Sequence, residues 1–380
     1  MKWFRWILVI SFTGGIYVGC ADVKFNKEPS DSCVAVGPDD CKVGGNKETY
    51  DYDLEIGFPQ VDILFVNDNS ASMTTEQKKL AQRFANFIQA LNTQAIDYRI
   101  AITTTDISSE KNPAREINKQ GALQDGKLIK FSNGEYFLTS RSGTLARQVE
   151  LFNEQIARPE TKQCDDFITN WTATASGTTY SQAYLENCPS QDERGIYAAN
   201  LVAKNNPESF LREKAKFALI IVSDEDERSQ LYYYNYDNFL LEPQDDPRGF
   251  VNAFRSKYPQ KSIATYPIIV ATESCKTQQD NQVHGVRSSY GLKYDELVNI
   301  TGGVVGDICS ANYTNQLGKI SASILEKINS VELNCTSPID LKIEFSGTSK
   351  DLPYTIEGKS VKFSKDLPAG TRLHLNYSCR

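Results

Sequence analysis

The chain has 380 residues, with 41 Lys and Arg against 48 Asp and Glu, so its formal net charge is -7 at pH 7 and its pI is near 5.2. Nucleic-acid binding needs a basic face, and this acidic balance argues against it. No complete phosphate loop, with Lys followed by Ser or Thr, occurs, and no glycine-rich dinucleotide motif follows the first predicted strand. We therefore expect neither a nucleic-acid-binding protein nor a nucleotide-dependent enzyme.

The N-terminus predicts export. Residues 1–5 are a short basic start, residues 6–19 are mostly apolar, and small residues precede Cys20, which is typical of a signal peptide over residues 1–19. The sequence Tyr17-Val18-Gly19-Cys20 resembles a bacterial lipobox, whose Cys carries a lipid anchor that includes palmitate. Ala21 follows in place of the Asp that retains lipoproteins in the inner membrane. We expect a lipid-anchored protein of the bacterial cell envelope, at the outer membrane.

Cysteine usage supports an oxidising compartment. The chain has nine Cys, so lipidation of Cys20 leaves eight, which is an even set for disulfides. Pairing of neighbours along the chain is the connectivity that we favour among the 105 possible ones. It joins Cys33 to Cys41, Cys164 to Cys188, Cys275 to Cys309 and Cys335 to Cys379. Zinc is a poor alternative, because no Cys-x-x-Cys pair occurs and the two His, His284 and His374, are far apart.

The middle of the chain predicts an α/β fold. Residues 20–57 are polar and read as a lipidated tether, and the core begins near Val61. Apolar strands alternate with helical patterns, which favours a doubly wound, mainly parallel sheet. The strands are expected at 61–66, 98–103, 217–222 and 263–270, and the helices at 74–91, 144–156, 194–204, 248–257 and 315–328.

Oxygen-bearing side chains follow two of these strands. Asp68, Ser70 and Ser72 come directly after the first strand, and Asp224 comes directly after the strand that ends at Val222. The carboxyl ends of parallel strands form the crevice in which open α/β sheets bind ligands. Carboxylate and hydroxyl oxygens are what Mg²⁺ prefers. The pattern therefore predicts a divalent-metal site, and a capping-box pair at Thr74 and Gln77 predicts that the loop leads into a helix. A plain turn and helix cap, in which the Asp and Ser side chains bond their own backbone, is the alternative that these residue types also allow.

The motif Asp68-x-Ser70-x-Ser72 resembles the metal-ion-dependent adhesion site of von Willebrand factor A domains. The resemblance covers residues 58–331 and implies Mg²⁺ or Mn²⁺ held by Asp68, Ser70, Ser72 and Asp224, with the last coordination position taken by a carboxylate of a protein partner. The family also uses a Thr from a third loop, and here Asp192 stands at that position, with Ser190, Glu193 and, further upstream, Thr178 and Thr179 as alternatives. A third carboxylate would favour Ca²⁺ or weaken partner binding.

Further residues are expected around this site. Asp106 ends a neighbouring strand and is either an acceptor that supports a ligand or a turn residue; Glu225 and Asp226 follow Asp224, and we expect at least one of them to face solvent. A tyrosine cluster then offers a partner-binding surface, with packing under the loop as the alternative. Its members are Tyr232, Tyr233, Tyr234 and Tyr236.

Two regions elaborate the minimal domain. Residues 127–139 alternate around Asn133-Gly134 and predict an antiparallel hairpin, while residues 158–191 read as a long polar loop stapled by Cys164 and Cys188. The final region, 332–380, alternates apolar and polar residues between Gly and Pro and predicts a small all-β module closed by Cys335 and Cys379.

The function that these patterns favour is non-catalytic, metal-dependent binding of a protein partner, as in adhesion. An envelope scaffold with a purely structural metal is the first alternative. A metal-assisted hydrolase is the second; it would need a base such as Glu193, Glu225 or Asp226.

Overall fold

The computed structural model describes most of the chain. Described are residues 48–55, 59–107, 124–172, 179–189, 193–228, 240–259, 261–281, 288–311, 313–347, 352–365, 367–368 and 370–379. Several predictions lie outside these residues: the signal peptide, Cys20, the Cys33–Cys41 pair, Thr178, Asp192 and the tyrosines at 232, 233, 234 and 236. Among the described helices, none combines the length and apolar composition that crossing a membrane requires.

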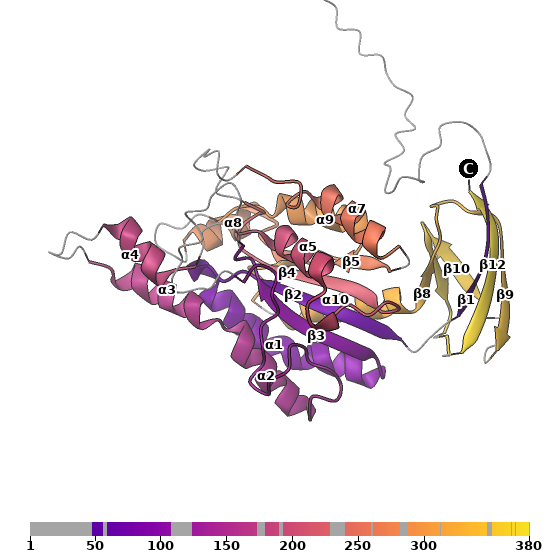
Figure 1. Ribbon diagram of the computed structural model, residues 1–380, viewed down its shortest axis with the longest axis horizontal. Coiled ribbons are helices and arrows are strands. Elements are labelled where there is room, and N and C mark those ends of the chain that lie inside the picture. The colour runs from indigo at the N-terminus through magenta and orange to yellow at the C-terminus, as the bar shows by residue number, and fades with distance from the viewer. Residues whose placement is uncertain are drawn as a thin grey trace, which may run out of the picture. The chain divides into compact units, whose positions relative to one another are not determined.

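A parallel sheet forms the centre of the larger domain (Figure 1). Its strands lie in the order β3-β2-β4-β6-β7, with β5 beside β4, and every pair is parallel. The strands are β2 (Gln60–Asn67), β3 (Asp97–Thr104), β4 (Lys216–Val222), β5 (Ile263–Thr265), β6 (Ile268–Ile269) and β7 (Gly306–Asp307). The single strand expected at 263–270 is interrupted at Tyr266-Pro267, because proline has no N–H for the ladder.

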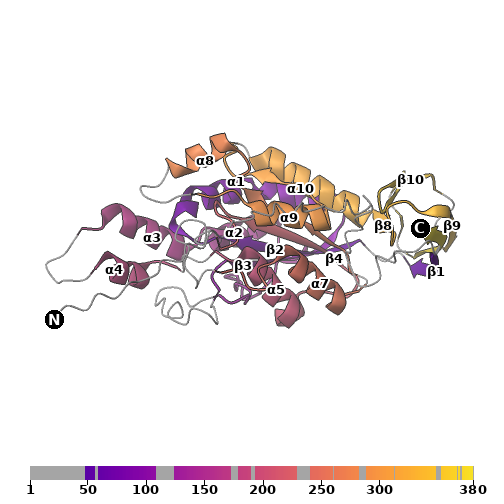
Figure 2. The ribbon, with the colours of Figure 1, turned by 90° about the horizontal axis from the view of Figure 1, so that it is seen from above.

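Helices cover both faces of this sheet, as Figures 1 and 2 show. On one face α1 (Thr74–Thr93) packs against α2 (Leu145–Ile156) and α10 (Tyr313–Ile328). On the other face lie α5 (Gly195–Asn205), α7 (Pro247–Lys257) and α9 (Leu292–Thr301). The remaining helices within the described residues are η1 (Ala71–Met73), α3 (Pro159–Asn170), α4 (Tyr180–Asn187), η3 (Pro207–Ser209) and α8 (Glu273–Asp280). This confirms the predicted doubly wound α/β fold class.

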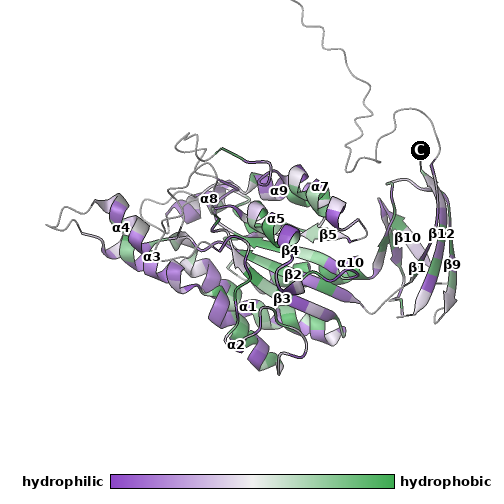
Figure 3. Cartoon of the chain, in the orientation of Figure 1, coloured by the Kyte–Doolittle hydropathy of each residue, from purple (hydrophilic) through white to green (hydrophobic). Residues whose placement is uncertain are grey.

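The two faces follow from the side-chain alternation of a strand. In β2, Ile63 and Phe65 join the core beneath α1, whereas Leu64 and Val66 join the core beneath α5. Figure 3 shows many hydrophobic positions in the sheet, as expected for strands buried on both faces, alongside hydrophilic positions on β2 and β3.

The strand order places a switch point between β2 and β4. From β2 the chain first adds β3 on one side and then returns to add β4 on the other. In open α/β sheets the ligand crevice lies beyond the carboxyl ends of the two strands at such a point. These are the strands that Asp68 and Asp224 follow.

The C-terminal module has two small antiparallel sheets, and part of the predicted tether belongs to one of them. That sheet has the order β1-β12-β9 and the other has β10-β11-β8. Their strands are β1 (Glu48–Glu55), β8 (Ser330–Glu332), β9 (Ile339–Gly347), β10 (Tyr354–Glu357), β11 (Ser360–Phe363) and β12 (Thr371–Cys379). Because β1 pairs with β12 from Glu48 to Glu55, the tether predicted to reach residue 57 ends before residue 48. The alternating residues Tyr50, Tyr52 and Leu54 pack on the core of the module. The residues between and around them are polar, which is why this short strand was not predicted.

Two other predictions are corrected. Residues 158–191 contain α3 and α4 rather than a long loop. The chain turns at Asn133-Gly134, where the Phe131 N–H donates to the Glu135 carbonyl, but its arms do not form a regular hairpin. The predicted antiparallel edge is present beside β3, where Leu138 exchanges hydrogen bonds with Ile100 and the Ile129 N–H donates to the Ile102 carbonyl, all at 2.8 Å. Pairing with the exposed edge of β3 satisfies these backbone groups.

The three described disulfides match the predicted pairing. They join Cys164 to Cys188, Cys275 to Cys309 and Cys335 to Cys379.

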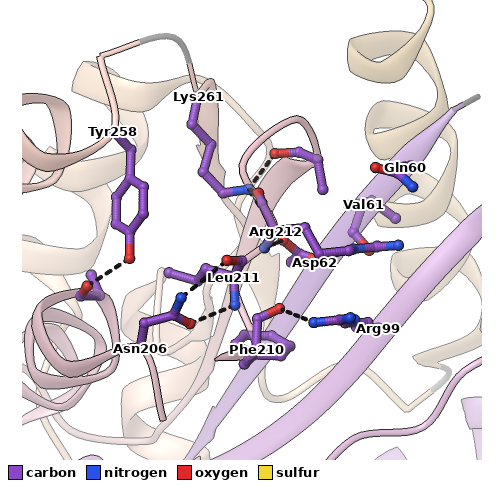
Figure 4. Close-up of polar contacts among 12 residues, drawn as sticks. Gln60, Val61, Asp62, Arg99, Asn206, Phe210, Leu211, Arg212, Tyr258 and Lys261 are labelled. Atoms are coloured by element: carbon purple, nitrogen blue, oxygen red, sulfur yellow. Dashed lines mark hydrogen bonds and ion pairs between the residues drawn. The ribbon is translucent and has the colours of Figure 1, made fainter. Parts of the chain in front are cut away.

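At the amino ends of the strands, a fully buried carboxylate is enclosed by cations (Figure 4). Asp62 accepts from Arg212 Nε at 2.8 Å, from the Arg212 backbone N–H at 2.7 Å and from Lys261 Nζ at 3.1 Å. Arg212 also pairs with Asp97. This network ties the start of β2 to the segments that precede β4 and β5.

Candidate metal centre

The loop after β2 is held at the carboxyl end of β4. The Asp68 backbone N–H donates to the Val222 carbonyl at 3.0 Å, so the strand pairing continues one step beyond β2. The chain then turns through Ser70 into η1 and α1. Asp68, Ser72 and Asp224 are buried and Ser70 is half-buried, so the predicted residues lie together at the switch point.

Five oxygen-bearing side chains meet there, the four predicted ones and that of Ser223. Ser72 Oγ donates to Asp224 Oδ1 at 3.0 Å and lies 3.0 Å from Ser70 Oγ. Asp68 Oδ1 accepts from the Ser70 backbone N–H at 2.8 Å. Asp68 Oδ2 accepts from Ser223 Oγ at 2.6 Å. These contacts join the β2 loop to the β4 loop through polar groups alone.

The electrostatics of this group are unusual for a protein interior. Burial raises the pKa of Asp68, and the hydrogen bonds from Ser223 and Ser70 only partly offset this. Burial raises the pKa of Asp224 well above its ordinary value, and the nearby charges of Asp68, Glu225 and Glu76 add to the rise. None of the ion pairs among the described residues includes Asp68 or Asp224. A buried carboxylate pair without a cation is costly, so the site is suited to an added positive charge.

The predicted capping box is wrong. Met73 is the cap residue of α1 and has no side-chain cap bond, while Thr74 Oγ1 donates to the Ala71 carbonyl at 3.1 Å. Gln77 Nε2 instead donates to the Asp68 carbonyl at 2.9 Å and to Thr161 Oγ1 at 3.0 Å. Because η1 precedes α1, the Gln77 side chain points to the loop of residues 68–72 rather than to the start of its own helix. This loop is called the metal loop below, because it carries three of the predicted ligands. The alternative of a plain turn rests on the loop's own side chains: Asp68 Oδ1 does bond the backbone of the loop at the Ser70 N–H, whereas Ser70, the N-cap residue of η1, makes no side-chain cap bond.

The segment that contains α3 and α4 packs directly on the metal loop. Thr161 Oγ1 donates to the Asn69 carbonyl at 2.8 Å, and Asn69 Nδ2 donates to Glu160 Oε1 at 3.4 Å. Ala71 lies in a small core with Cys164 and Cys188. The disulfide thus fixes α3 and α4 against the turn that carries Ser70 and Ser72.

The third loop is described only from Glu193 onward. Glu193 is buried and pairs through its backbone with Asp106, and its carbonyl accepts from the Arg228 N–H at 2.7 Å. Thr179, one of the upstream alternatives, caps α4 by accepting from the Gln182 N–H, so it is used structurally.

Buried charges hold the start of α5. Arg194 donates to both carboxylate oxygens of Asp245, at 2.8 and 2.9 Å. The Glu227 carboxylate accepts from the backbone N–H groups of Ile196 and Tyr197 at 2.8 and 3.0 Å. A carboxylate at a helix N-terminus is favoured by the exposed N–H groups. This network connects the segment after Asp224 with the third loop.

The expectation for Glu225 and Asp226 is wrong, because both are buried. Asp226 Oδ1 accepts from the Lys293 N–H at 2.9 Å, which anchors the start of α9, and burial raises the pKa of Asp226 to about 7. Asp106 is buried beside Glu193, and its carbonyl accepts from the Asp125 N–H at 3.1 Å. Asp226 thus anchors α9, and Asp106 lies beside the third loop.

The donor set fits a hard divalent cation. Two carboxylates and two hydroxyls from two loops provide oxygen ligands, and their excess negative charge has no partner within the described chain. A second cluster, Cys275, Asp307 and Cys309, lies close together, but its two thiols form a disulfide and offer no thiolate.

Sequence reasoning missed several residues that shape this site. They are Ser223, which bonds Asp68; Glu76, which is buried beside Asp224; and Glu227 and Asp245, which fix the third loop. Ser223 could have been found, since it stands between a strand and Asp224. The others depend on contacts between distant segments.

Comparisons with known proteins give little beyond this geometry. No protein-family model and no curated protein matches the chain. Among solved structures, the pilus adhesin SpaC from Lactobacillus rhamnosus GG matches at 9% identity over 87% of this chain and 42% of its own, with a TM-score of 0.31. BatB from Bacteroides thetaiotaomicron matches at 11% identity over 71% and 98%, with a TM-score of 0.32. The human COPII-coat protein Sec24c matches at 9% identity over 87% and 45%, with a TM-score of 0.36. The chain spans less than half of SpaC and of Sec24c, and likenesses this distant do not define its function.

Proposed function

We propose that the chain binds a divalent cation, Mg²⁺ or otherwise Mn²⁺ or Ca²⁺, at Asp68, Ser70, Ser72 and Asp224, and uses it to bind a protein partner without catalysis. The observation that carries this proposal is the buried pair Asp68 and Asp224, which faces hydroxyl groups and has no compensating cation among the described residues. Such a pair must either retain a proton, as the raised pKa values of both carboxyls indicate, or gain a positive charge.

The partner is expected to contribute a carboxylate. A bound cation supplies positive charge that an anionic ligand can coordinate. The chain's own residues leave the loop half-exposed at Ser70, so a ligand can approach from that side, while Ser223 and Gln77 hold Asp68 in place. This is the arrangement that the resemblance to the adhesion site of von Willebrand factor A domains implies.

Asp192 is proposed as the further ligand from the third loop. A third carboxylate would lower the positive charge left on the cation and would favour the larger Ca²⁺, which accepts more oxygen ligands. The choice between Mg²⁺ and Ca²⁺ therefore reports on Asp192.

The proposed location is the outer membrane of a bacterial envelope, with a lipid on Cys20. Disulfides persist in oxidising compartments, and the three disulfides of the described residues support export.

Thermal unfolding of the chain from Ala21, titrated with Mg²⁺, Mn²⁺ and Ca²⁺ after chelation, tests the proposal. A cation at about a hundred times its dissociation constant should stabilise the native state by roughly 2.7 kcal/mol. The stabilisation should disappear in Asp68→Ala and persist in Glu213→Ala, which removes an exposed carboxylate from another part of the domain. Equal melting temperatures with and without every ion would refute metal binding.

The alternative is a scaffold protein whose metal only staples the two loops. It shares the thermal shift but predicts that an acidic partner binds equally well to metal-loaded and metal-free protein at a temperature where both are folded. Hydrolysis is not proposed, since Asp226 is occupied by the backbone of α9 and Glu193 is packed beside Asp106.

A further inference from the structure

The stapled helical pair α3 and α4, here called the α3–α4 arm, belongs to no part of the metal site proper. It contacts the loop through Thr161 and Glu160, as described above, and α3 packs against η1. Figures 1 and 2 show the two helices side by side. The α3–α4 arm therefore borders the loop that carries Ser70 and Ser72.

The arm carries more aromatic surface than its own packing needs. Phe167 and Tyr184 pack on the core formed by Ala71 and the Cys164–Cys188 disulfide. Tyr180 stacks on Phe167 with 5.6 Å between ring centroids, and Trp171 meets Tyr180 edge-on at 5.2 Å. Tyr180 nevertheless remains 41% exposed. Rigid, partly exposed aromatic groups are typical anchors of protein interfaces.

The charge of the arm is negative. Residues 158–172 and 179–189 contain Glu160, Asp165, Asp166 and Glu186 against Arg158 and Lys162. Both cations are already paired, Arg158 with Glu160 at 2.7 Å and Lys162 with Asp166 at 2.6 Å. Asp165 has no ion-pair partner among the described residues. The ring faces of Tyr180 and Trp171 add negative potential to the same arm.

We propose that the α3–α4 arm selects partners in which the metal-binding carboxylate is flanked by Lys or Arg. This inference rests on the proposed metal-dependent function. An acidic arm beside a cation would repel a uniformly acidic segment, whereas the Lys or Arg side chains of a mixed-charge segment can pair with Asp165 or lie over the Tyr180 ring. The arm thus adds specificity for a mixed-charge segment that the cation alone cannot provide.

A displayed library of short peptides with one fixed central Asp, selected on the full chain in excess Mg²⁺, tests this. The expected result is enrichment of Lys and Arg next to the Asp, with release of the peptides by EDTA. Selection on the double variant Asp165→Lys, Asp166→Lys should turn the preference towards acidic neighbours. Asp166 is exposed and Asp165 is half-buried, so a melting temperature close to that of the wild type is required of the double variant as the control for folding.

Tyr180→Ala gives an independent measurement. It should weaken the selected basic peptides about fivefold, the effect of losing an exposed cation–π contact of about 1 kcal/mol. The Mg²⁺-dependent melting shift should not change. Tyr354→Ala, at a similarly exposed tyrosine of β10, should leave peptide binding unaltered.

The outcomes separate the two proposals. Mg²⁺-dependent peptides without a charge preference, or with the same preference after charge reversal, would overturn the role of the arm and leave the metal-dependent function standing. Binding of neutral glycans that requires Tyr180 and ignores Asp165 would overturn it in favour of a carbohydrate partner. A wild-type protein without any Mg²⁺ melting shift would remove the proposed function and this inference together.

Discussion

Strand β2 has a buried aspartate at each end, and the two are treated in opposite ways. Asp62, at the amino end, is enclosed by Arg212 and Lys261 (Figure 4). Asp68, at the carboxyl end, meets only hydroxyl and amide donors and lies near a second buried carboxylate, Asp224. Both side chains are fully inaccessible to solvent.

On the proposed function, this difference separates a structural charge at Asp62 from a cation-binding site at Asp68 and Asp224. An internal carboxylate must be compensated, and at Asp62 the chain supplies the cations itself. At Asp68 and Asp224 the described residues supply no cation, which is expected of residues that bind a cation from solution. The same substitution at the two ends of β2 should therefore have opposite consequences.

The largest effect is expected for Asp62→Asn. The neutral amide leaves the buried ammonium of Lys261 and the guanidinium of Arg212 without their anion, which should cost about 3 kcal/mol of unfolding free energy. Urea unfolding at neutral pH should show this loss equally in EDTA and in Mg²⁺. A loss below about 1 kcal/mol would mean that Asp97 and backbone carbonyls compensate the two cations without Asp62.

Asp68→Asn should behave differently. In EDTA the variant should be at least as stable as the wild type, because the neutral amide removes repulsion between two buried carboxylates. In saturating Mg²⁺ only the wild type should gain the increment of roughly 2.7 kcal/mol at a hundredfold excess over the dissociation constant. Parallel urea titrations measure both effects. A variant that is destabilised in EDTA and still gains from Mg²⁺ would contradict the comparison.

A pH series sharpens the same contrast. Burial raises the native-state pKa of Asp68 and of Asp224, so the unfolded chain loses these protons first, near the ordinary aspartate pKa of about 4. The free energy of unfolding in EDTA should therefore fall as the pH rises above that value, by at most about 1.4 kcal/mol per pH unit for each proton.

The control is Asp224→Asn, which should flatten this slope. Other carboxylates act in the opposite direction, such as Asp280, whose pKa is lowered by the side chains of Lys276 and Ser288. The difference between wild type and variant isolates the site. Saturating Mg²⁺ should remove the difference, and identical slopes in EDTA would show that Asp224 does not titrate as described.

The strands and the candidate ligands could be predicted from the sequence, because both depend on local residue patterns. Apolar runs located β2, β3 and β4, and Asp68, Ser70, Ser72 and Asp224 could be placed at one edge of the sheet, because residues that follow parallel strands share that edge. The disulfide partners also followed chain order.

What could not be predicted depends on contacts between distant segments. Asp62 pairs with Lys261, which lies far along the sequence from it. Strand β1 pairs with β12, so two segments near opposite ends of the chain are joined. Helices α3 and α4 carry few apolar residues, because they bury only one side against the metal loop and each other. Their weak periodicity therefore read as a loop.

The sequence predicts a helix cap at Gln77, but the structure places its side chain between two segments. Replacing it is expected to change the unfolding free energy less than the substitutions above. It donates to the Asp68 carbonyl and to Thr161, and its Oε1 accepts from the Arg158 N–H at 2.9 Å, so it joins the metal loop to the α3–α4 arm. Gln77→Ala should cost about 1 kcal/mol of unfolding free energy, since buried partners lose their hydrogen bonds.

The larger consequence of Gln77→Ala should be in cation affinity rather than in stability. A loop that is no longer fixed from behind must be ordered when the cation binds, so the Mg²⁺ melting shift should need a severalfold higher concentration. Gln163→Ala, at an exposed position of α3, should change neither quantity. If Gln77→Ala lowers stability but leaves the Mg²⁺ dependence untouched, the loop is positioned by Ser223 and the Asp68–Val222 backbone bond alone, and the arm is attached to the site without helping to form it.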